Sequence, residues 1–165
     1  MPENLKFEIE RKWLLSSLPD AVMGITPIEY ERYFLPSEQG EEIRIQKVGD
    51  KYTYQKKIEV PGVGRERAED RGISEEEFLE LKKTAIGSIL RTRYDLSSIV
   101  AIQVYHGKHE GLIRYEVEFQ SVDESEAFQP EPWAGREITD SPLGRDSRLL
   151  FMSDDEFQEE LRRYS

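Results

Sequence analysis

Polar and apolar residues alternate with a period of two through much of this 165-residue chain. The segment from Phe7 to Trp13 is an example, because Glu8, Glu10 and Lys12 share one parity and hydrophobic residues take the other. Successive side chains of a β-strand point to opposite faces, so this pattern predicts strands with one polar and one apolar face. A fold built mainly from such strands is therefore expected.

Segments with this strand character follow one another with short links. The pair Gly49-Asp50 is typical of the tight turn of a β-hairpin. Eight or nine strands within one domain predict a sandwich or a barrel. The segments are residues 7–13, 28–34, 42–46, 52–57, 65–73, 88–94, 99–105, 112–119 and 133–139.

Three segments carry the capping pattern that opens a helix, a Ser or Asp followed three residues later by Glu. The first predicted helix keeps its apolar spacing as far as Ile89, although Gly87 blurs its end. The last is a C-terminal helix over residues 153–165 with an apolar stripe. The capping pairs are Ser74 with Glu77, Asp123 with Glu126, and Ser153 with Glu156.

Composition narrows the class of protein. The net charge of −11 repels polyanions, so we expect neither nucleic acid nor a membrane surface as a partner. Cysteine is absent, which excludes disulfides and thiolate metal sites. No apolar run approaches the roughly 20 residues of a membrane-spanning helix. We expect a single cytoplasmic domain over residues 1–165 that acts on a small molecule.

The polar strand faces carry like charges two residues apart. Paired carboxylates from different strands suit a hard divalent cation, which takes several oxygen ligands. Paired guanidinium groups suit phosphate, whose oxygens they bind in bidentate fashion. A charged strand that faces solvent is the alternative explanation for any one segment. The like-charged pairs are Glu8/Glu10, Glu116/Glu118 and Arg91/Arg93, and the run Arg67/Glu69/Arg71 places two arginines around a glutamate at the same spacing.

The order of these motifs along the chain is itself informative. Residues 8–12 read Glu-Ile-Glu-Arg-Lys, and they match the Glu-x-Glu-x-Lys signature of the CYTH superfamily, the triphosphate tunnel metalloenzymes. The chain resembles this family over about residues 5–150 and is similar to its small, single-domain bacterial members. The other matching elements are Tyr33, Ile43-Arg44-Ile45, Lys57, Arg67-x-Glu69, Arg91-x-Arg93, residues 115–119 (Tyr-Glu-Val-Glu-Phe) and residues 132–139 (Pro-Trp-x-Gly-x-Glu-Ile-Thr).

The resemblance implies an α+β, predominantly β fold: an eight-stranded antiparallel closed β-barrel with a few flanking helices. It implies Mg²⁺ or Mn²⁺ as cofactor, and hydrolysis of inorganic tripolyphosphate or a nucleoside triphosphate. A homodimer is an expectation of the family. By position, the metal ligands are Glu8, Glu10, Glu116, Glu118 and Glu137; the phosphate-binding residues are Lys12, Arg44, Lys57, Arg67, Arg91 and Arg93; and Glu69 lies near the attacking water, with Lys12 also catalytic.

Several positions depart from the family pattern. Gln46 and Gln103 stand where an arginine and an aspartate are usual, and Arg71 stands where a glutamate is usual. Arg114 adds a cation at a position that is usually apolar, so Arg71 and Arg114 are further candidates for substrate binding. These changes leave open a catalytically weakened module that binds polyphosphate or a nucleotide, and an adenylate cyclase of the same fold. Hydrolysis is the preferred interpretation.

Overall fold

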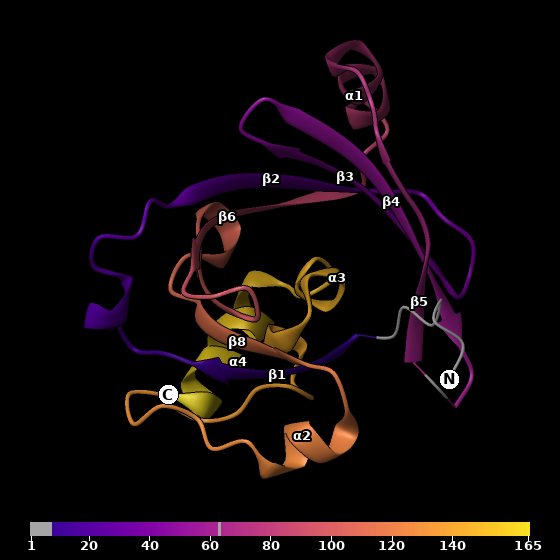
Figure 1. Ribbon diagram of the computed structural model, residues 1–165. Helices are drawn as coiled ribbons and strands as arrows, with labels where there is room; N and C mark the ends of the chain where they lie inside the picture. The colour runs from indigo at the N-terminus through magenta and orange to yellow at the C-terminus, as the bar shows by residue number, and fades with distance from the viewer. Residues whose placement is uncertain (1–7, 63) are drawn as a thin grey trace. The chain divides into compact units, whose positions relative to one another are not determined.

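The computed structural model describes residues 8–62 and 64–165 (Figure 1). Eight strands form antiparallel ladders, which confirms the predominantly β, antiparallel prediction; closure into a barrel stays a prediction. The strands are β1 (Ile9–Leu14), β2 (Ile28–Leu35), β3 (Glu41–Val48), β4 (Lys51–Val60), β5 (Gly64–Gly72), β6 (Gly87–Asp95), β7 (Val100–Tyr105) and β8 (Ile113–Phe119). The helices are α1 (Glu75–Lys82), α2 (Val122–Ala127), α3 (Asp146–Leu149) and α4 (Asp154–Tyr164), with short 3₁₀ turns η1 (Asp20–Val22), η2 (Gly107–His109) and η3 (Pro142–Gly144).

The chain divides into two compact units. One unit holds Glu8 and residues 30–88, and the other holds residues 9–29 and 89–165. The prediction of one domain over residues 1–165 stays a prediction. None of the helices in the described part of the chain is long and apolar enough to cross a lipid bilayer.

The unit of residues 30–88 is a meander of β2, β3, β4 and β5 with α1 against one face. The hairpin predicted at Gly49-Asp50 is confirmed, and Gly49 takes a positive φ of 59° that favours glycine. Phe78 of α1 packs on the apolar strand face, against the buried Leu35 and Ile45. The opposite face of β3 and β4 is therefore left to the polar residues.

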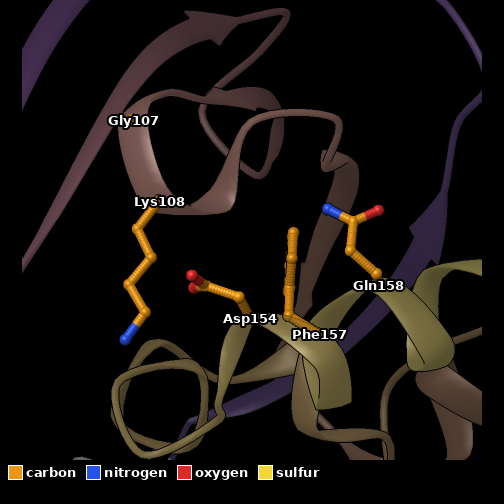
Figure 2. Close-up of a pocket in the computed structure, with 5 residues that line it drawn as sticks. All are labelled: Gly107, Lys108, Asp154, Phe157 and Gln158. Carbon is orange, nitrogen blue, oxygen red and sulfur yellow. The ribbon is translucent and has the colours of Figure 1, made fainter.

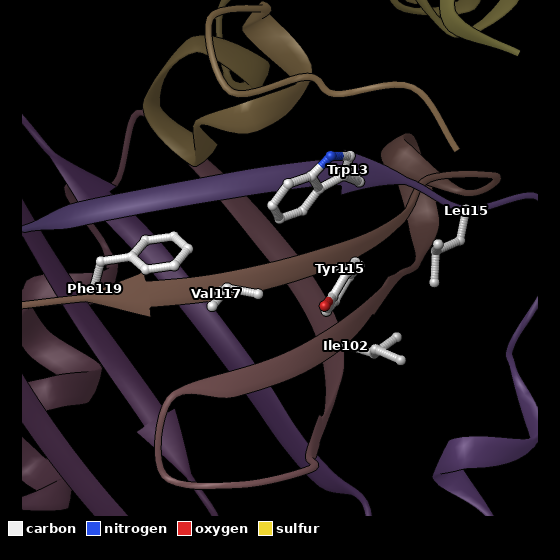
Figure 3. Packing of buried hydrophobic residues seen from close by; sticks show 6 residues of the cluster. All are labelled: Trp13, Leu15, Ile102, Tyr115, Val117 and Phe119. Atoms are coloured by element: carbon white, nitrogen blue, oxygen red, sulfur yellow. The ribbon is translucent and has the colours of Figure 1, made fainter. Parts of the chain in front are cut away.

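The second unit orders its strands β1, β8, β7, β6. The alternate residues of β1, β7 and β8 bury one apolar cluster, which Figure 3 shows from close by. Phe128, just after α2, closes this cluster by packing its ring 5.7 Å from that of Trp13 and 5.2 Å from that of Phe119. The cluster holds Trp13, Leu15, Ile102, Tyr115, Val117 and Phe119.

Three sequence-based assignments differ from the structure. Helix α2 is capped by Ser121, whose hydroxyl accepts from the backbone N–H of Glu124, rather than by Asp123 with Glu126. The segment 133–139, predicted as a strand, forms an isolated bridge, Trp13↔Glu137. A few backbone hydrogen bonds join it to β1, but the chain enters η3 before a ladder develops. Helix α1 ends at Lys82 rather than continuing to Ile89, because the residues from Gly87 onward are paired in β6. The C-terminal helix is confirmed, and Ser153 with Glu156 forms its capping box.

Candidate functional site

One polar strand face of the second unit gathers most of the residues predicted to bind metal and phosphate. On the β1/β8 ladder Glu10 lies opposite Glu118, and Lys12 lies opposite Glu116. Neighbouring ladders place Gln103 opposite both Arg93 and Arg114, so all of these side chains leave the sheet on the same side. This set, called the Glu116 face below, comprises Glu10, Lys12, Arg91, Arg93, Gln103, Arg114, Glu116 and Glu118.

Glu116 is the centre of a buried hydrogen-bond network. Its Oε1 accepts from Nε of Arg114 at 2.9 Å and lies 2.7 Å from the Nη2 of the same guanidinium. Its Oε2 accepts from the amide Nε2 of Gln103 at 2.5 Å. Burial raises the pKa of Glu116, but the charges of Arg114 and Lys12 outweigh burial and lower it to about 2. Glu116 is therefore a fixed anion whose two oxygens already have donors.

Asp146 of α3 supports this network from outside the sheet. It accepts a hydrogen bond from the hydroxyl of Tyr105 at 2.6 Å, and it lies 3.4 Å from both the Arg91 and the Arg114 guanidinium. It is buried and was absent from the sequence-based site. It lies outside every motif that matches the family, so the sequence offered no signal for it. Two buried arginines thus share two buried carboxylates.

The turn before α3 also reaches the site. The carbonyl of Gly144 accepts from Nζ of Lys12 at 2.7 Å, while Glu10 lies 3.2 Å and Glu116 3.8 Å from the same ammonium. A Cβ at Gly144 would come within 2.4 Å of the Ile138 carbonyl oxygen, so only glycine permits this close approach. The turn therefore orients Lys12 over the Glu116 face.

Glu137 lies apart from the other predicted metal ligands. Its carboxylate accepts from Nε and Nη2 of Arg11 at 3.1 and 2.7 Å, and from the Thr139 hydroxyl at 2.6 Å. Arg11 is on the face of β1 that carries Trp13, opposite to the face of Glu10 and Lys12, and its guanidinium stacks over the Trp13 ring. The hydrogen bond from Arg11 lowers the pKa of Glu137. Glu137 thus forms an ion pair with Arg11 at the surface.

The other unit presents a second polar face, called the Lys57 face, made of Arg32, Arg44, Gln46, Gln55, Lys57 and Arg67. The register places these side chains on the side of the sheet away from α1. Nζ of Lys57 donates to both oxygens of Glu8 at 2.9 and 2.7 Å, and Arg67 donates at 3.0 Å. Burial raises the pKa of Glu8, but Lys57 and Arg67 outweigh it and lower the pKa to about 2.

A β-bulge separates Arg67 from the two predicted site residues that follow it. Lys57 pairs with Arg67, but Lys56 pairs with Glu69, so β5 accommodates one extra residue at this point. Glu69 and Arg71 consequently leave the sheet on the side of α1, where the Arg71 guanidinium lies 4.6 Å from the Tyr54 ring. The expectation that Arg67, Glu69 and Arg71 share one face is wrong. Asp70 takes the place beside Arg67, 3.1 Å away.

The carboxylates differ in how well they fit a divalent cation. No cluster of three or more Asp, Glu or His side chains that could hold a metal occurs within residues 8–62 and 64–165. Glu116 and Glu8 each have hydrogen-bond donors on both oxygens, which a metal would have to displace or share. Glu10 and Glu118 lie directly opposite each other, where two like charges repel. Such a pair fits Mg²⁺, which keeps several waters and takes one or two carboxylates plus substrate phosphates.

A separate pocket of about 600 Å³ opens where η2 meets the start of α4 (Figure 2). Gly107, Lys108, Asp154, Phe157 and Gln158 line it, and none of these belongs to either polar face. Its single lysine and its acidic residue offer little for a polyanion. The pocket is not the candidate site.

Comparison with known proteins agrees with the resemblance read from the motifs. No family model matches the chain. It is 31% identical over 147 residues to a protein from Nitrosomonas europaea named inorganic triphosphatase, covering 86% of this chain and 95% of that one. The crystal structure of an inorganic triphosphatase superposes with a TM-score of 0.66 at 26% identity, over 91% of this chain and 98% of the other.

A more distant structure shares the fold alone. It is that of a Hippeastrum protein with a dominant triphosphatase activity, which aligns with a TM-score of 0.51 and 11% identity. The alignment covers 73% of this chain and 84% of that one.

Proposed function

Because the chain belongs to the CYTH superfamily of triphosphate tunnel metalloenzymes, we propose that it hydrolyses a linear triphosphate, either inorganic tripolyphosphate or a nucleoside triphosphate. The observation that carries the proposal is the concentration of cations on two polar strand faces of a protein whose net charge is −11. A likeness to a named inorganic triphosphatase along 95% of its length supports the substrate class.

Electrostatic neutralisation is the chemistry that these faces supply. A triphosphate resists attack mainly because its negative charge repels a nucleophile, and catalysis of phosphoryl transfer is mostly positioning and charge stabilisation. Lys12, Arg91, Arg93 and Arg114 supply that charge on the Glu116 face, and Arg44, Lys57 and Arg67 supply it on the Lys57 face. Water is the proposed nucleophile.

Within this set Lys12 has the central role. The Gly144 carbonyl and the flanking carboxylates hold its ammonium on the Glu116 face, where it is positioned to stabilise charge on a phosphoryl oxygen. Glu69 and Arg71 stand outside the proposal, because the bulge places them on the α1 side of the sheet.

We propose Glu10 and Glu118 as the residues that hold Mg²⁺ or Mn²⁺ together with the substrate. A cation held there would supply positive charge that offsets the negative charge of the substrate's phosphate oxygens. Glu8 is a further candidate ligand of the metal. Its carboxylate would have to give up the hydrogen bonds that Lys57 and Arg67 donate to it. This proposal keeps the closed barrel and the homodimer, which the family resemblance implies, and the cytoplasmic location expected from the composition.

The experiment that tests the proposal incubates the purified protein with tripolyphosphate, ATP or thiamine triphosphate in Mg²⁺, Mn²⁺ or EDTA. Phosphate, pyrophosphate and cyclic AMP are measured. We expect phosphate release that EDTA and Glu118→Gln abolish. Metal binding is scored separately, because a cation at a hundredfold excess over its Kd stabilises the folded state by about 2.7 kcal/mol. At this chain length that raises Tm by roughly 5–10 °C.

Each alternative predicts a different result. Tight binding of tripolyphosphate without turnover in any metal would identify a binding module. Cyclic AMP from ATP would identify a cyclase. Phosphate release at an equal rate in EDTA would contradict the metal dependence but leave hydrolysis intact.

A further inference from the structure

The residues where η3 runs into α3 contact several cations of the Glu116 face. They are residues 143–146, called the η3–α3 turn below. The Leu143 carbonyl accepts a hydrogen bond from Nη1 of Arg114 at 3.1 Å, and the Gly144 carbonyl accepts from Nζ of Lys12 at 2.7 Å. The Gly144 carbonyl lies closer to the Lys12 ammonium than the flanking carboxylates do. The place of the turn therefore sets where this ammonium lies.

Asp146 ends the turn with a carboxylate that is 4% exposed. Its Oδ1 accepts a hydrogen bond from the Tyr105 hydroxyl at 2.6 Å, a length typical of a strong bond between a hydroxyl and a carboxylate. The guanidinium groups of Arg91 and Arg114 each lie 3.4 Å from the same carboxylate. The Tyr105 hydroxyl is thus closer to Asp146 than either guanidinium.

Tyr105 is itself held firmly in the sheet. It is the last residue of β7 and pairs with Arg91 of β6, and its backbone N–H donates to the Leu112 carbonyl at 3.0 Å. The residue is 1% exposed. Burial raises the pKa of Tyr105 well above its ordinary value, so the hydroxyl keeps its proton and is the donor to Asp146. The hydroxyl is therefore a rigid point of attachment for the turn.

The attachment is close to the carbonyl that contacts Lys12. One residue, Arg145, separates Asp146 from Gly144, so their Cα atoms are at most about 7 Å apart along the chain. A connection this short has little slack. A change in the place of Asp146 is therefore expected to move the Gly144 carbonyl as well.

We propose that Tyr105 is a positioning residue for the reaction, which acts on Lys12 through the η3–α3 turn. Its hydroxyl anchors Asp146, and the anchored turn keeps the Gly144 carbonyl against the ammonium of Lys12. The inference rests on the proposed function, in which that ammonium stabilises charge on a phosphoryl oxygen. Because a misplacement of about 1 Å can lower a rate about 10²-fold, such an anchor affects kcat without contact with the substrate.

Tyr105→Phe is the decisive variant, because it removes one oxygen and leaves Asp146 its contacts with the arginines. Initial rates of phosphate release from tripolyphosphate are measured in Mg²⁺, well below the Tm of every variant, so that lost stability does not enter the rate. We expect kcat to fall by about 10–100-fold. KM should change by less than about threefold, because the cations of the polar faces remain.

Tyr115→Phe is the matched control. Tyr115 is as buried as Tyr105, but it belongs to the apolar cluster on the opposite face of the sheet (Figure 3). The control should keep the wild-type kcat even if its Tm falls. A purely structural role for the Tyr105 hydroxyl predicts the same result for Tyr105→Phe, and that result overturns the inference.

A double variant tests whether Tyr105 acts through Lys12. Lys12→Met/Tyr105→Phe should have the kcat of Lys12→Met alone, because no ammonium is left to position. If the two losses of kcat multiply instead, Tyr105 acts independently of Lys12 and the inference is wrong. A wild-type protein that releases no phosphate from tripolyphosphate would refute the proposed function itself, and with it the role of Tyr105.

Discussion

Replacing Lys12 by methionine is expected to lower kcat for tripolyphosphate by about 10²–10³-fold, the usual effect of removing one preorganised charge stabiliser from an active site. Methionine keeps most of the length and apolar stem of lysine but removes the ammonium. That ammonium is held by the Gly144 carbonyl at 2.7 Å and lies 3.2 Å from Glu10. The fold should survive, because the apolar cluster of β1 is on the opposite face.

Initial rates of phosphate release, together with Tm, measure this effect. Lys108→Met is the control, because Lys108 is an exposed lysine of η2 that belongs to neither polar face. It should leave kcat unchanged. A Lys12→Met protein that keeps wild-type kcat at an unchanged Tm would remove Lys12 from the catalytic machinery.

The second large effect concerns stability. Arg114→Met is expected to destabilise the protein by about 3–5 kcal/mol, the cost of leaving the partners of a buried ion pair uncompensated. Arg114 is 2% exposed and donates to Glu116, to the Leu143 carbonyl and to Asp146. Interaction with Glu116 raises the pKa of Arg114 despite its burial, so the guanidinium is charged throughout the range of folded stability.

Urea unfolding of the metal-free protein measures this loss. The double variant Arg114→Met/Glu116→Gln should lose less than the two single variants together, because it leaves no unpaired charge at that pair. Arg162→Met, on the exposed side of α4, is the control and should change stability by no more than about 0.5 kcal/mol. Equal stability of Arg114→Met and the wild type would mean that Arg114 is not paired as described.

Periodicity in the sequence predicted most of the fold because each strand has one buried and one polar face. That alternation placed Glu10, Lys12, Glu116 and Glu118 on polar strand faces, whereas the pairing of Glu10 with Glu118 and of Lys12 with Glu116 is set by the register of β1 and β8. Alternation fails where the backbone departs from the pleat. At the β5 bulge, one extra residue moved Glu69 and Arg71 to the other face, and nothing in the local residue types announced it.

The partners of the charged residues were harder to predict than their faces. Glu137 was assigned to metal by its position in a motif, but Arg11, 126 residues earlier, binds it on the other side of β1. Asp146 and Gln55 became site residues only through contacts made across strands or from a helix. Such contacts depend on three-dimensional placement, and a sequence pattern with a period of two contains no record of them.

The proposal that this protein hydrolyses tripolyphosphate is tested most directly by a single reaction in ¹⁸O-labelled water. The protein, in excess over tripolyphosphate and with Mg²⁺ present, is followed by ³¹P NMR, which resolves tripolyphosphate, pyrophosphate and phosphate and detects the isotope shift of a labelled oxygen. We expect tripolyphosphate to disappear and one ¹⁸O atom to enter the products for each bond cleaved. Tripolyphosphate that binds to the protein but stays intact and unlabelled would contradict the proposed hydrolysis.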